Sequence, residues 1–154
     1  MKRRTFLRAT IAGSALAVAA GAGLLTPRQV LAANWPTAAF SGKTADAAIK
    51  SLYGTSKRTA SKAIKINASV QAEDGSSVPV AVKTTLKNVE SMSIFVHENG
   101  QPLVANANLT GGGGYLRTNI KMLKTSKVEF VVKAGGKLHT ASLKIKVTAG
   151  GCGG

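Results

Sequence analysis

The sequence contains little cysteine, histidine or acid. Its single cysteine, Cys152, excludes a disulfide within the chain, so the fold must depend on the burial of apolar side chains. One cysteine without a neighbouring histidine offers too few ligands for a closed metal site, and we expect neither a metal nor a cofactor. The six acids are scattered, and only Glu73 and Asp74 adjoin. The sequence therefore contains no clear pair of catalytic carboxylates.

A long apolar run is also missing. The uncharged stretch 9–25 is diluted by glycine and is shorter than the roughly 18 residues that span a membrane. It follows the basic start Lys2-Arg3-Arg4 and precedes Val30-Leu31-Ala32, where small or apolar residues suit a signal peptidase. This order predicts a twin-arginine (Tat) signal peptide over residues 1–32, cleaved after Ala32 or Ala33, and a periplasmic protein without a membrane anchor. A transmembrane anchor is the alternative.

The chain is strongly basic. Removing residues 1–32 removes five of the 21 Lys and Arg residues and no acid, which leaves 16 cations against 6 acids and a net charge near +10. Nucleic acid is an improbable partner for an exported protein, and lysines such as Lys65 and Lys144 stand singly in alternating stretches. We expect most lysines on the solvated faces of strands, where their field concentrates small anions and steers acidic partners.

Residues 33–62 are interpreted as a lead-in followed by a short helix. Thr44 is the predicted N-cap of a helix that runs to Tyr53, and Gly54 is its predicted stop. The positions that share the apolar face of this helix are Ala45, Ala48, Ile49 and Leu52. Residues 55–62 are polar and are predicted to form a linker.

Residues 63–148 are predicted to form an all-β domain. Seven short segments alternate apolar and polar residues and are separated by turn residues; they are 64–70, 78–86, 91–97, 103–109, 116–122, 128–132 and 137–147. Pro79 marks the second segment as an edge or bulged strand. No crossover helix separates the segments, so we expect antiparallel pairing. The pattern favours an immunoglobulin-like antiparallel sandwich of about seven strands, with a small closed barrel as the competitor.

Residues 149–154 are predicted to form a flexible arm. Gly150, Gly151, Gly153 and Gly154 surround Cys152 and provide no side chain that could pack. The five residues from Val147 to Cys152 can extend roughly 16–18 Å. A thiol on such an arm can enter a narrow pocket of another protein, because only backbone accompanies it.

The chemistry of a thiol suits a covalent carrier. The thiolate is the nucleophile, and a free thiol with a pKa of about 8.5 is ionised to a few per cent near neutral pH. Sulfur also bonds to sulfur through oxidation or exchange, which gives an adduct that is stable yet cleavable. The alternatives are an incidental free thiol and a disulfide between two chains.

An enzymatic role is not expected. A Cys/His nucleophile pair would combine Cys152 with His97 or His139, but a glycine arm cannot hold such a pair within hydrogen-bond reach. The run Gly111–Gly114 lacks the Lys-Ser/Thr of a phosphate-binding Walker motif, and no helix is predicted after it. It is better interpreted as a loop near a sheet edge.

The ending Gly-Gly-Cys-Gly-Gly at residues 150–154 resembles that of SoxY, the carrier subunit of the periplasmic thiosulfate-oxidising system. The Tat-like leader, the helix before the strands and the stretch Arg-Thr-Asn-Ile-Lys-Met at residues 117–122 are also similar to this family. The likeness covers essentially the whole chain. It implies a carrier rather than an enzyme, in which thiosulfate is conjugated to Cys152 as an S-thiosulfonate and presented to partner enzymes.

The resemblance also implies the partners. These are a SoxZ-like subunit in a heterodimer, a haem c-type thiosulfate-coupling enzyme (SoxAX-like), a metal-dependent thiosulfohydrolase (SoxB-like) and, in some organisms, a sulfane dehydrogenase (SoxCD-like). An exposed apolar patch on one sheet face is expected for the partner chain. The alternative function is an exported immunoglobulin-like binding module whose lone cysteine forms an intermolecular disulfide.

Overall fold

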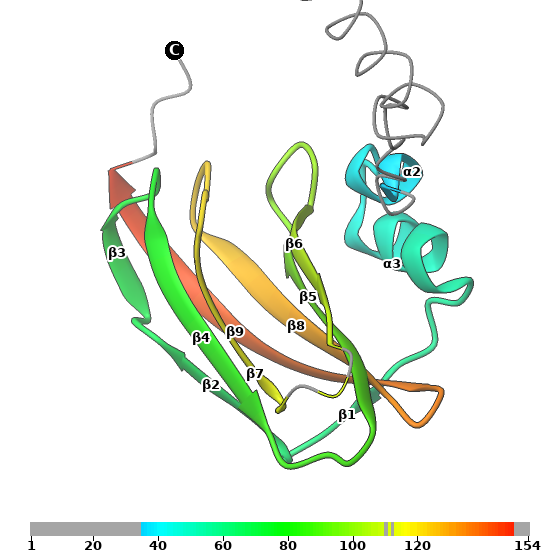
Figure 1. The fold of residues 1–154 in the computed structure, drawn as a ribbon. Coiled ribbons are helices and arrows are strands. Elements are labelled where there is room, and N and C mark those ends of the chain that lie inside the picture. The colour runs from blue at the N-terminus through cyan, green and yellow to red at the C-terminus, as the bar shows by residue number, and fades with distance from the viewer. Residues whose placement is uncertain (1–34, 110, 112, 150–154) are drawn as a thin grey trace, which may run out of the picture. The chain divides into compact units, whose positions relative to one another are not determined.

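A computed structural model describes residues 35–109, 111 and 113–149, and Figure 1 shows its arrangement. The described helices and strands lie in the second of two units into which the chain divides, Pro36–Gly154. They are α2 (Thr37–Phe40), α3 (Ala45–Tyr53), β1 (Thr59–Ala60), β2 (Ile64–Ala68), β3 (Gln71–Asp74), β4 (Val78–Thr84), β5 (Val89–Val96), β6 (Leu103–Asn108), β7 (Tyr115–Ile120), β8 (Ser126–Ala134) and β9 (Lys137–Ala149). In this part of the chain no helix is both long and apolar enough to cross a membrane.

The strands form two sheets that face each other. The larger sheet has the order β1-β9-β8-β5-β6, with β3 also paired to β9, and the smaller has the order β2-β4-β7. This arrangement confirms the predicted all-β sandwich with a short helix before it. The seven predicted strands correspond to β2 and β4 to β9. No strand of one sheet pairs with the other among the described residues, which excludes the closed barrel.

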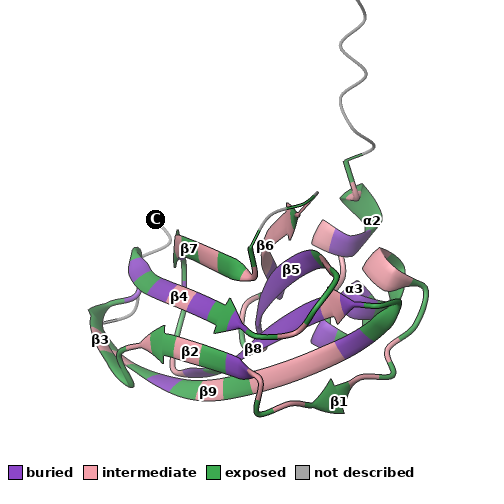
Figure 2. Ribbon diagram, turned by 60° about the horizontal axis from the view of Figure 1, so that its bottom comes forward, coloured by how far each residue is buried: buried purple, intermediate pink, exposed green. Residues whose placement is uncertain are grey.

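The main core lies between the two sheets. Every second residue of β4 is buried, namely Val78, Val80, Val82 and Thr84, and the others face outward (Figure 2). The facing positions of the larger sheet are equally apolar, and they include Met92, Ile94, Val96, Val128, Phe130, Val132 and Ile145. Burial of such side chains contributes about 1.5–3 kcal/mol each, which explains how the fold holds without a disulfide.

Helix α3 covers part of the outer face of the larger sheet. The hydroxyl of Thr44 accepts a hydrogen bond from the Ala47 N–H at 3.2 Å, and Gly54 ends the helix with φ 76°. Both predicted helix boundaries are therefore confirmed. The buried face of the helix region meets outward-facing residues of the sheet in a second cluster, which contains Ala39, Ala45, Ala48, Ile49, Phe95, Leu103, Val131 and Leu138.

Two short strands pair in parallel with β9, contrary to the expectation of antiparallel pairing throughout. In β1, Thr59 pairs with His139, and in β3, Ala72 pairs with Val147. β1 lies in the predicted linker. β9 has 13 residues and extends beyond its antiparallel neighbour β8. The ladder between the two strands stops at Ser126, the first residue of β8, which pairs with Ile145. Its last residues can therefore take a partner from elsewhere in the chain.

The prediction for Pro79 is wrong. β4 is the central strand of the smaller sheet, since it pairs with both β2 and β7. Pro79 pairs with Asn119 of β7, whereas the pairing with β2 stops at Val80, opposite Ala68. The ladder with β2 does not extend to position 79, so no hydrogen bond to β2 is lost because proline has no N–H. A proline is therefore tolerated in this central strand.

The glycine run 111–114 lies in the loop that joins β6 of the larger sheet to β7 of the smaller sheet. Its described member Gly114 lies against β4, where its carbonyl accepts a hydrogen bond from the Thr84 N–H at 2.7 Å. A Cβ at position 114 would lie 2.5 Å from Cγ2 and 2.9 Å from the carbonyl oxygen of Thr84. The absence of a side chain is required here for the close approach of two backbones.

We expect Gly114→Ala to lower the free energy of unfolding by about 1–3 kcal/mol, because the added methyl group must displace the backbone of β4. Gly113→Ala is the matched control, since a Cβ at position 113 meets nothing within 4 Å. Urea denaturation of both variants measures the difference. Equal free energies of unfolding for the two variants would show that the contact between Gly114 and Thr84 leaves room for a methyl group.

Candidate functional site

The predicted attachment residue, Cys152, lies outside the described residues. The same holds for Gly150, Gly151, Gly153 and Gly154. The structure does describe β9 as far as Ala149, and so it defines the position from which the arm leaves the domain. The candidate site is therefore built from the end of β9 and the segments around it.

The end of β9 is held on both sides. On one side it pairs with β3, up to the pair formed by Asp74 and Ala149. On the other side the hydroxyl of Thr125 accepts a hydrogen bond from the Val147 N–H at 3.0 Å. The Thr148 hydroxyl adds a bond to the carbonyl of Ala72 at 3.4 Å. The strand is thus fixed as far as Ala149, so the predicted start of the arm at residue 149 is wrong: this residue still belongs to β9 because it pairs with Asp74 of β3.

The reach of Cys152 follows from this fixed end. The earlier estimate took the free segment to begin at Val147, but Val147 is paired within the sheet. Only three residues lead from Ala149 to Cys152, and three residues of any conformation span at most about 11 Å. The Cα of Cys152 therefore lies within about 11 Å of the Cα of Ala149.

Three loops lie at the same end of the sandwich as the end of β9 (Figure 1). They are the β3–β4 turn, the β5–β6 loop and the β7–β8 loop. The Met122 N–H donates to the carbonyl of Gly75 at 2.7 Å, which joins two of them. Asn99 joins the third, since its amide donates to the carbonyl of Lys121 at 2.8 Å and accepts from the Leu123 N–H at 3.1 Å. β9 thus ends at a rim of cross-linked loops.

Charges of both signs lie near the end of β9. Lys144 and Lys146 are exposed on this strand, as the alternating sequence predicted. Lys127 of the neighbouring strand β8 lies opposite Lys144 in the strand register. Glu73 and Asp74 are exposed on β3. The hydroxyl and the N–H of Ser76 both bind the Asp74 carboxylate, which lowers the pKa of Asp74. Lysines outnumber acids around this point, so an anionic group on the arm is compatible with it.

Neither histidine is placed to form a Cys/His catalytic pair. His139 pairs with Val132 near the start of β9, about 33 Å along the strand from Ala149, which is beyond the reach of the arm. His97 is nearer, but its Nε2 lies 2.8 Å from Oε2 of Glu129. This nitrogen already has a carboxylate partner.

Sequence reasoning missed a buried ionic group on the outer face of the larger sheet, which we call the Glu129 cluster. The Glu129 side chain is only 3% exposed, and its carboxylate binds Arg58 Nε at 2.6 Å, His97 Nε2 at 2.8 Å and the Thr140 hydroxyl at 2.9 Å. Burial alone would raise the pKa of Glu129. The hydrogen bonds outweigh burial and lower this pKa to about 2.

The Glu129 cluster joins segments that are distant in sequence. Arg58 belongs to the polar segment after α3, and it also binds Asp46 of α3 at 2.8 Å and the carbonyl of Ser56 at 2.9 Å. The sequence does contain a signal for this site. Glu129 and Val131 are two residues apart in a strand and so lie on the same face, and an apolar residue on an outward face indicates that other parts of the chain cover this face. The arrangement fixes the helix to the sheet and presents no free nucleophile.

A resident metal ion has no evident site in the described part of the chain. No three histidine, cysteine or acidic side chains gather there in a way that could hold one. Within the described residues, the side chains near β9 offer hydrogen bonds and charge. The one strong nucleophile of the sequence is the thiol of Cys152.

The chain is similar to known proteins of one family. Residues 49–152 match the family described as "Sulfur oxidation protein SoxY". Among solved structures, the sulfur carrier protein SoxY from Chlorobium limicola f thiosulfatophilum is 36% identical with a TM-score of 0.63, over 71% of this chain and 96% of that chain. A superoxide reductase from Ignicoccus hospitalis is 16% identical over 59% of this chain and 81% of its own, but its TM-score of 0.49 supports no further comparison. No curated protein sequence matches significantly.

The family match extends over the described domain and reaches Cys152. The Chlorobium protein adds more than a third of identical residues over nearly its full length. These two findings agree on one family, and the chain therefore belongs to the SoxY family of sulfur oxidation proteins.

Proposed function

We propose that this protein is a covalent carrier of sulfur intermediates in thiosulfate oxidation, with Cys152 as the attachment point. One observation carries the proposal: the match to the SoxY family runs from Ile49 to Cys152 and so includes both the sandwich and the thiol. The fixed end of β9 supports it, because a carrier needs a domain that stays folded while a short segment presents the bound group.

The first step joins two sulfur atoms. The Cys152 thiol loses its proton, its sulfur bonds to the terminal sulfur of thiosulfate, and two electrons pass to a haem c-type coupling enzyme (SoxAX-like). The product is an S-thiosulfonate that carries one negative charge. The lysines near the end of β9 favour this anion through their field. Catalysis remains with the partner enzyme, and this chain acts as its covalently bound substrate.

Later steps release the oxidised sulfur. A metal-dependent thiosulfohydrolase (SoxB-like) adds water to the terminal sulfone, which leaves as sulfate and a proton, and one sulfur stays on Cys152 as a persulfide. In some organisms a sulfane dehydrogenase (SoxCD-like) takes electrons from the outer sulfur, which gains its oxygen atoms from water and becomes an S-sulfonate. Hydrolysis of the sulfur–sulfur bond then releases sulfate and restores the thiol. An arm that spans at most about 11 Å beyond Ala149 requires each enzyme to approach the rim closely.

Location and assembly belong to the same proposal. The leader over residues 1–32 directs the folded protein to the periplasm by the Tat route. There the chain forms a heterodimer with a SoxZ-like subunit. The alternative is an exported binding module that uses Cys152 for an intermolecular disulfide. The two functions differ in the chemical state of the thiol, and this state can be measured.

Mass spectrometry of the peptide that contains Cys152 tests the proposal. After incubation of the reduced protein with thiosulfate and the haem c-type enzyme, we expect a gain equal to one thiosulfate residue, which reducing agent removes. Thiosulfate without the enzyme should give no gain, because no acceptor takes the two electrons. A peptide found only as the free thiol or as a Cys–Cys crosslink would refute the carrier role.

A further inference from the structure

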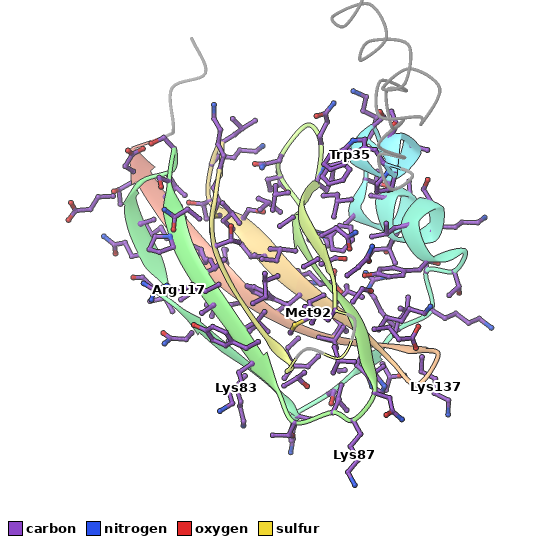
Figure 3. All side chains as sticks on the ribbon, viewed as in Figure 1. Trp35, Lys83, Lys87, Met92, Arg117 and Lys137 are labelled. Atoms are coloured by element: carbon purple, nitrogen blue, oxygen red, sulfur yellow. The ribbon has the colours of Figure 1, made fainter. Side chains whose placement is uncertain are left out.

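The outer face of the smaller sheet, opposite the core, carries an unbalanced positive charge. The strand register places Lys65 of β2 directly beside Lys83 of β4, and Arg117 of β7 beside Ala81 of β4. These three cations are exposed and alternate with buried or half-buried residues, and Figure 3 shows Lys83 and Arg117 on the outer side of this sheet. None of the three has an ion-pair partner among the described residues.

The acids of the chain all lie elsewhere. Of the six in the sequence, four form ion pairs on other parts of the domain, through Arg58, Lys124, Lys127, Lys133 and His97. The remaining two, Glu73 and Asp74, belong to β3. The outer face of β2, β4 and β7 is therefore cationic without any internal compensation.

Such an arrangement is costly for the folded protein. Like charges that face each other across neighbouring strands repel, and Lys65 opposite Lys83 is such a pair. Four of the six acids are used to compensate cations elsewhere on this domain. A face left uncompensated is the expected form of a surface that meets negative charge from outside.

The same face contains a depression suited to specific contact. Its volume is about 260 Å³, and its floor is formed by the short side chains of Pro79 and Ala81. Arg117 and Tyr115 lie along one side, with Asn67 and Ser69 along the other. Tyr115 is 54% exposed, which is high for a large apolar side chain. Tyrosine and arginine beside a depression are the residue types that dominate the binding energy of protein interfaces.

We propose that the outer face of β2, β4 and β7 docks an acidic surface of a partner protein, with Arg117 at the centre and Tyr115, Lys83 and Lys65 side by side at one end. The proposal rests on the proposed function, because it names the surface by which the carrier meets an enzyme that modifies Cys152. The partner presents carboxylates, one of which pairs with the Arg117 guanidinium.

The size of the face fits a brief encounter. Three strands about 4.8 Å apart, each paired over five or six residues, present a few hundred Å², which is less than the roughly 800 Å² per partner of a stable complex. A carrier must leave each enzyme after reaction, so a small, charge-steered contact is suited to it. The face also adjoins the β3–β4 turn, which follows the strand paired with the end of β9, because Asn119 of β7 donates to Ser77 of that turn at 3.0 Å.

The test compares two charge-reversal proteins in the reaction of the full chain with thiosulfate and the haem c-type enzyme. We expect the double variant Lys83→Glu/Arg117→Glu to raise KM for the carrier about tenfold at low salt, with kcat nearly unchanged. Lys137→Glu is the control, because Lys137 is exposed at the start of β9, outside this face (Figure 3). Its KM should change less than about twofold.

The outcomes separate the two proposals. Equal effects of the double variant and of Lys137→Glu would overturn the docking surface, while adduct formation would still support the carrier. If the wild type forms no adduct, a second measurement decides: NMR titration of the labelled protein with poly-L-glutamate should shift resonances of β4 and β7 most. Shifts of similar size around Lys137 would overturn the docking surface. Identical shifts with sulfate alone would assign the face to small anions and overturn it as well.

Discussion

Replacing Cys152 by serine should abolish thiosulfate-dependent turnover in a reconstituted system and leave the unfolding transition unchanged. A serine hydroxyl does not ionise near neutral pH and cannot form the sulfur–sulfur bond that holds the intermediate. The described ladder of β9 ends at Ala149, so the substitution removes none of its hydrogen bonds. Turnover is measured by electron transfer to the haem enzyme, and folding by urea denaturation. Turnover by the serine variant at the wild-type rate would contradict the proposed function.

Moving the thiol to another position separates two requirements for activity, namely the presence of a thiol and its position on the predicted arm. Ser142 is exposed in the middle of β9, opposite Glu129 of β8. In the double variant Cys152→Ser/Ser142→Cys the thiol is present but sits on a paired strand, where backbone and neighbouring side chains limit access. We expect this protein to remain inactive while reacting with a small thiol reagent. Recovery of turnover would show that no arm is needed.

Replacing Glu129 by glutamine should lower the free energy of unfolding by about 3 kcal/mol. The change removes a carboxylate that is 3% exposed and leaves the Arg58 guanidinium without its main partner. That is a large part of the 5–15 kcal/mol typical of a domain. Glu98→Gln is the matched control, because the ion pair of Glu98 with Lys124 is exposed and worth at most about 1 kcal/mol. Equal losses in the two variants would contradict the importance of the Glu129 cluster.

The pH dependence of stability gives an independent measurement of Glu129. Its pKa is about 2 in the folded protein and 4.5 in the reference state, so the folded protein binds its proton less readily. The stabilisation is complete above pH 4.5 and is lost as the pH falls toward 2. The difference corresponds to about 3 kcal/mol. The glutamine variant should lose this part of the acid sensitivity, as thermal unfolding between pH 2 and 6 will measure.

Local patterns were sufficient for much of the fold. The helix boundaries at Thr44 and Gly54 follow from capping chemistry that involves only neighbouring residues. The seven predicted strands follow from alternation with period two, which burial on one face imposes. Each of these features is determined within about ten residues of chain.

Features that depend on distant partners were not predictable. β3 has no apolar alternation of its own, and it is a strand only because β9 extends beyond β8 and offers it a free edge. Pro79 looked unsuited to a central strand because the sequence does not show where the neighbouring β2 stops. Arg58 and Glu129 are separated by 71 positions, and no local pattern relates them. The outer cationic face likewise appears only when three strands are placed in register.

The parallel pairing of β1 and β3 with β9 has a consequence for how the chain assembles. β9 is the last of the described strands, yet it lies between β1 and β8 in the larger sheet. During synthesis, both short strands and one edge of β8 have no partner until residues 137–149 have been made. Contacts of such long sequence separation form slowly. The sheet that supports the thiol is therefore completed only when the segment adjoining that thiol has itself been synthesised.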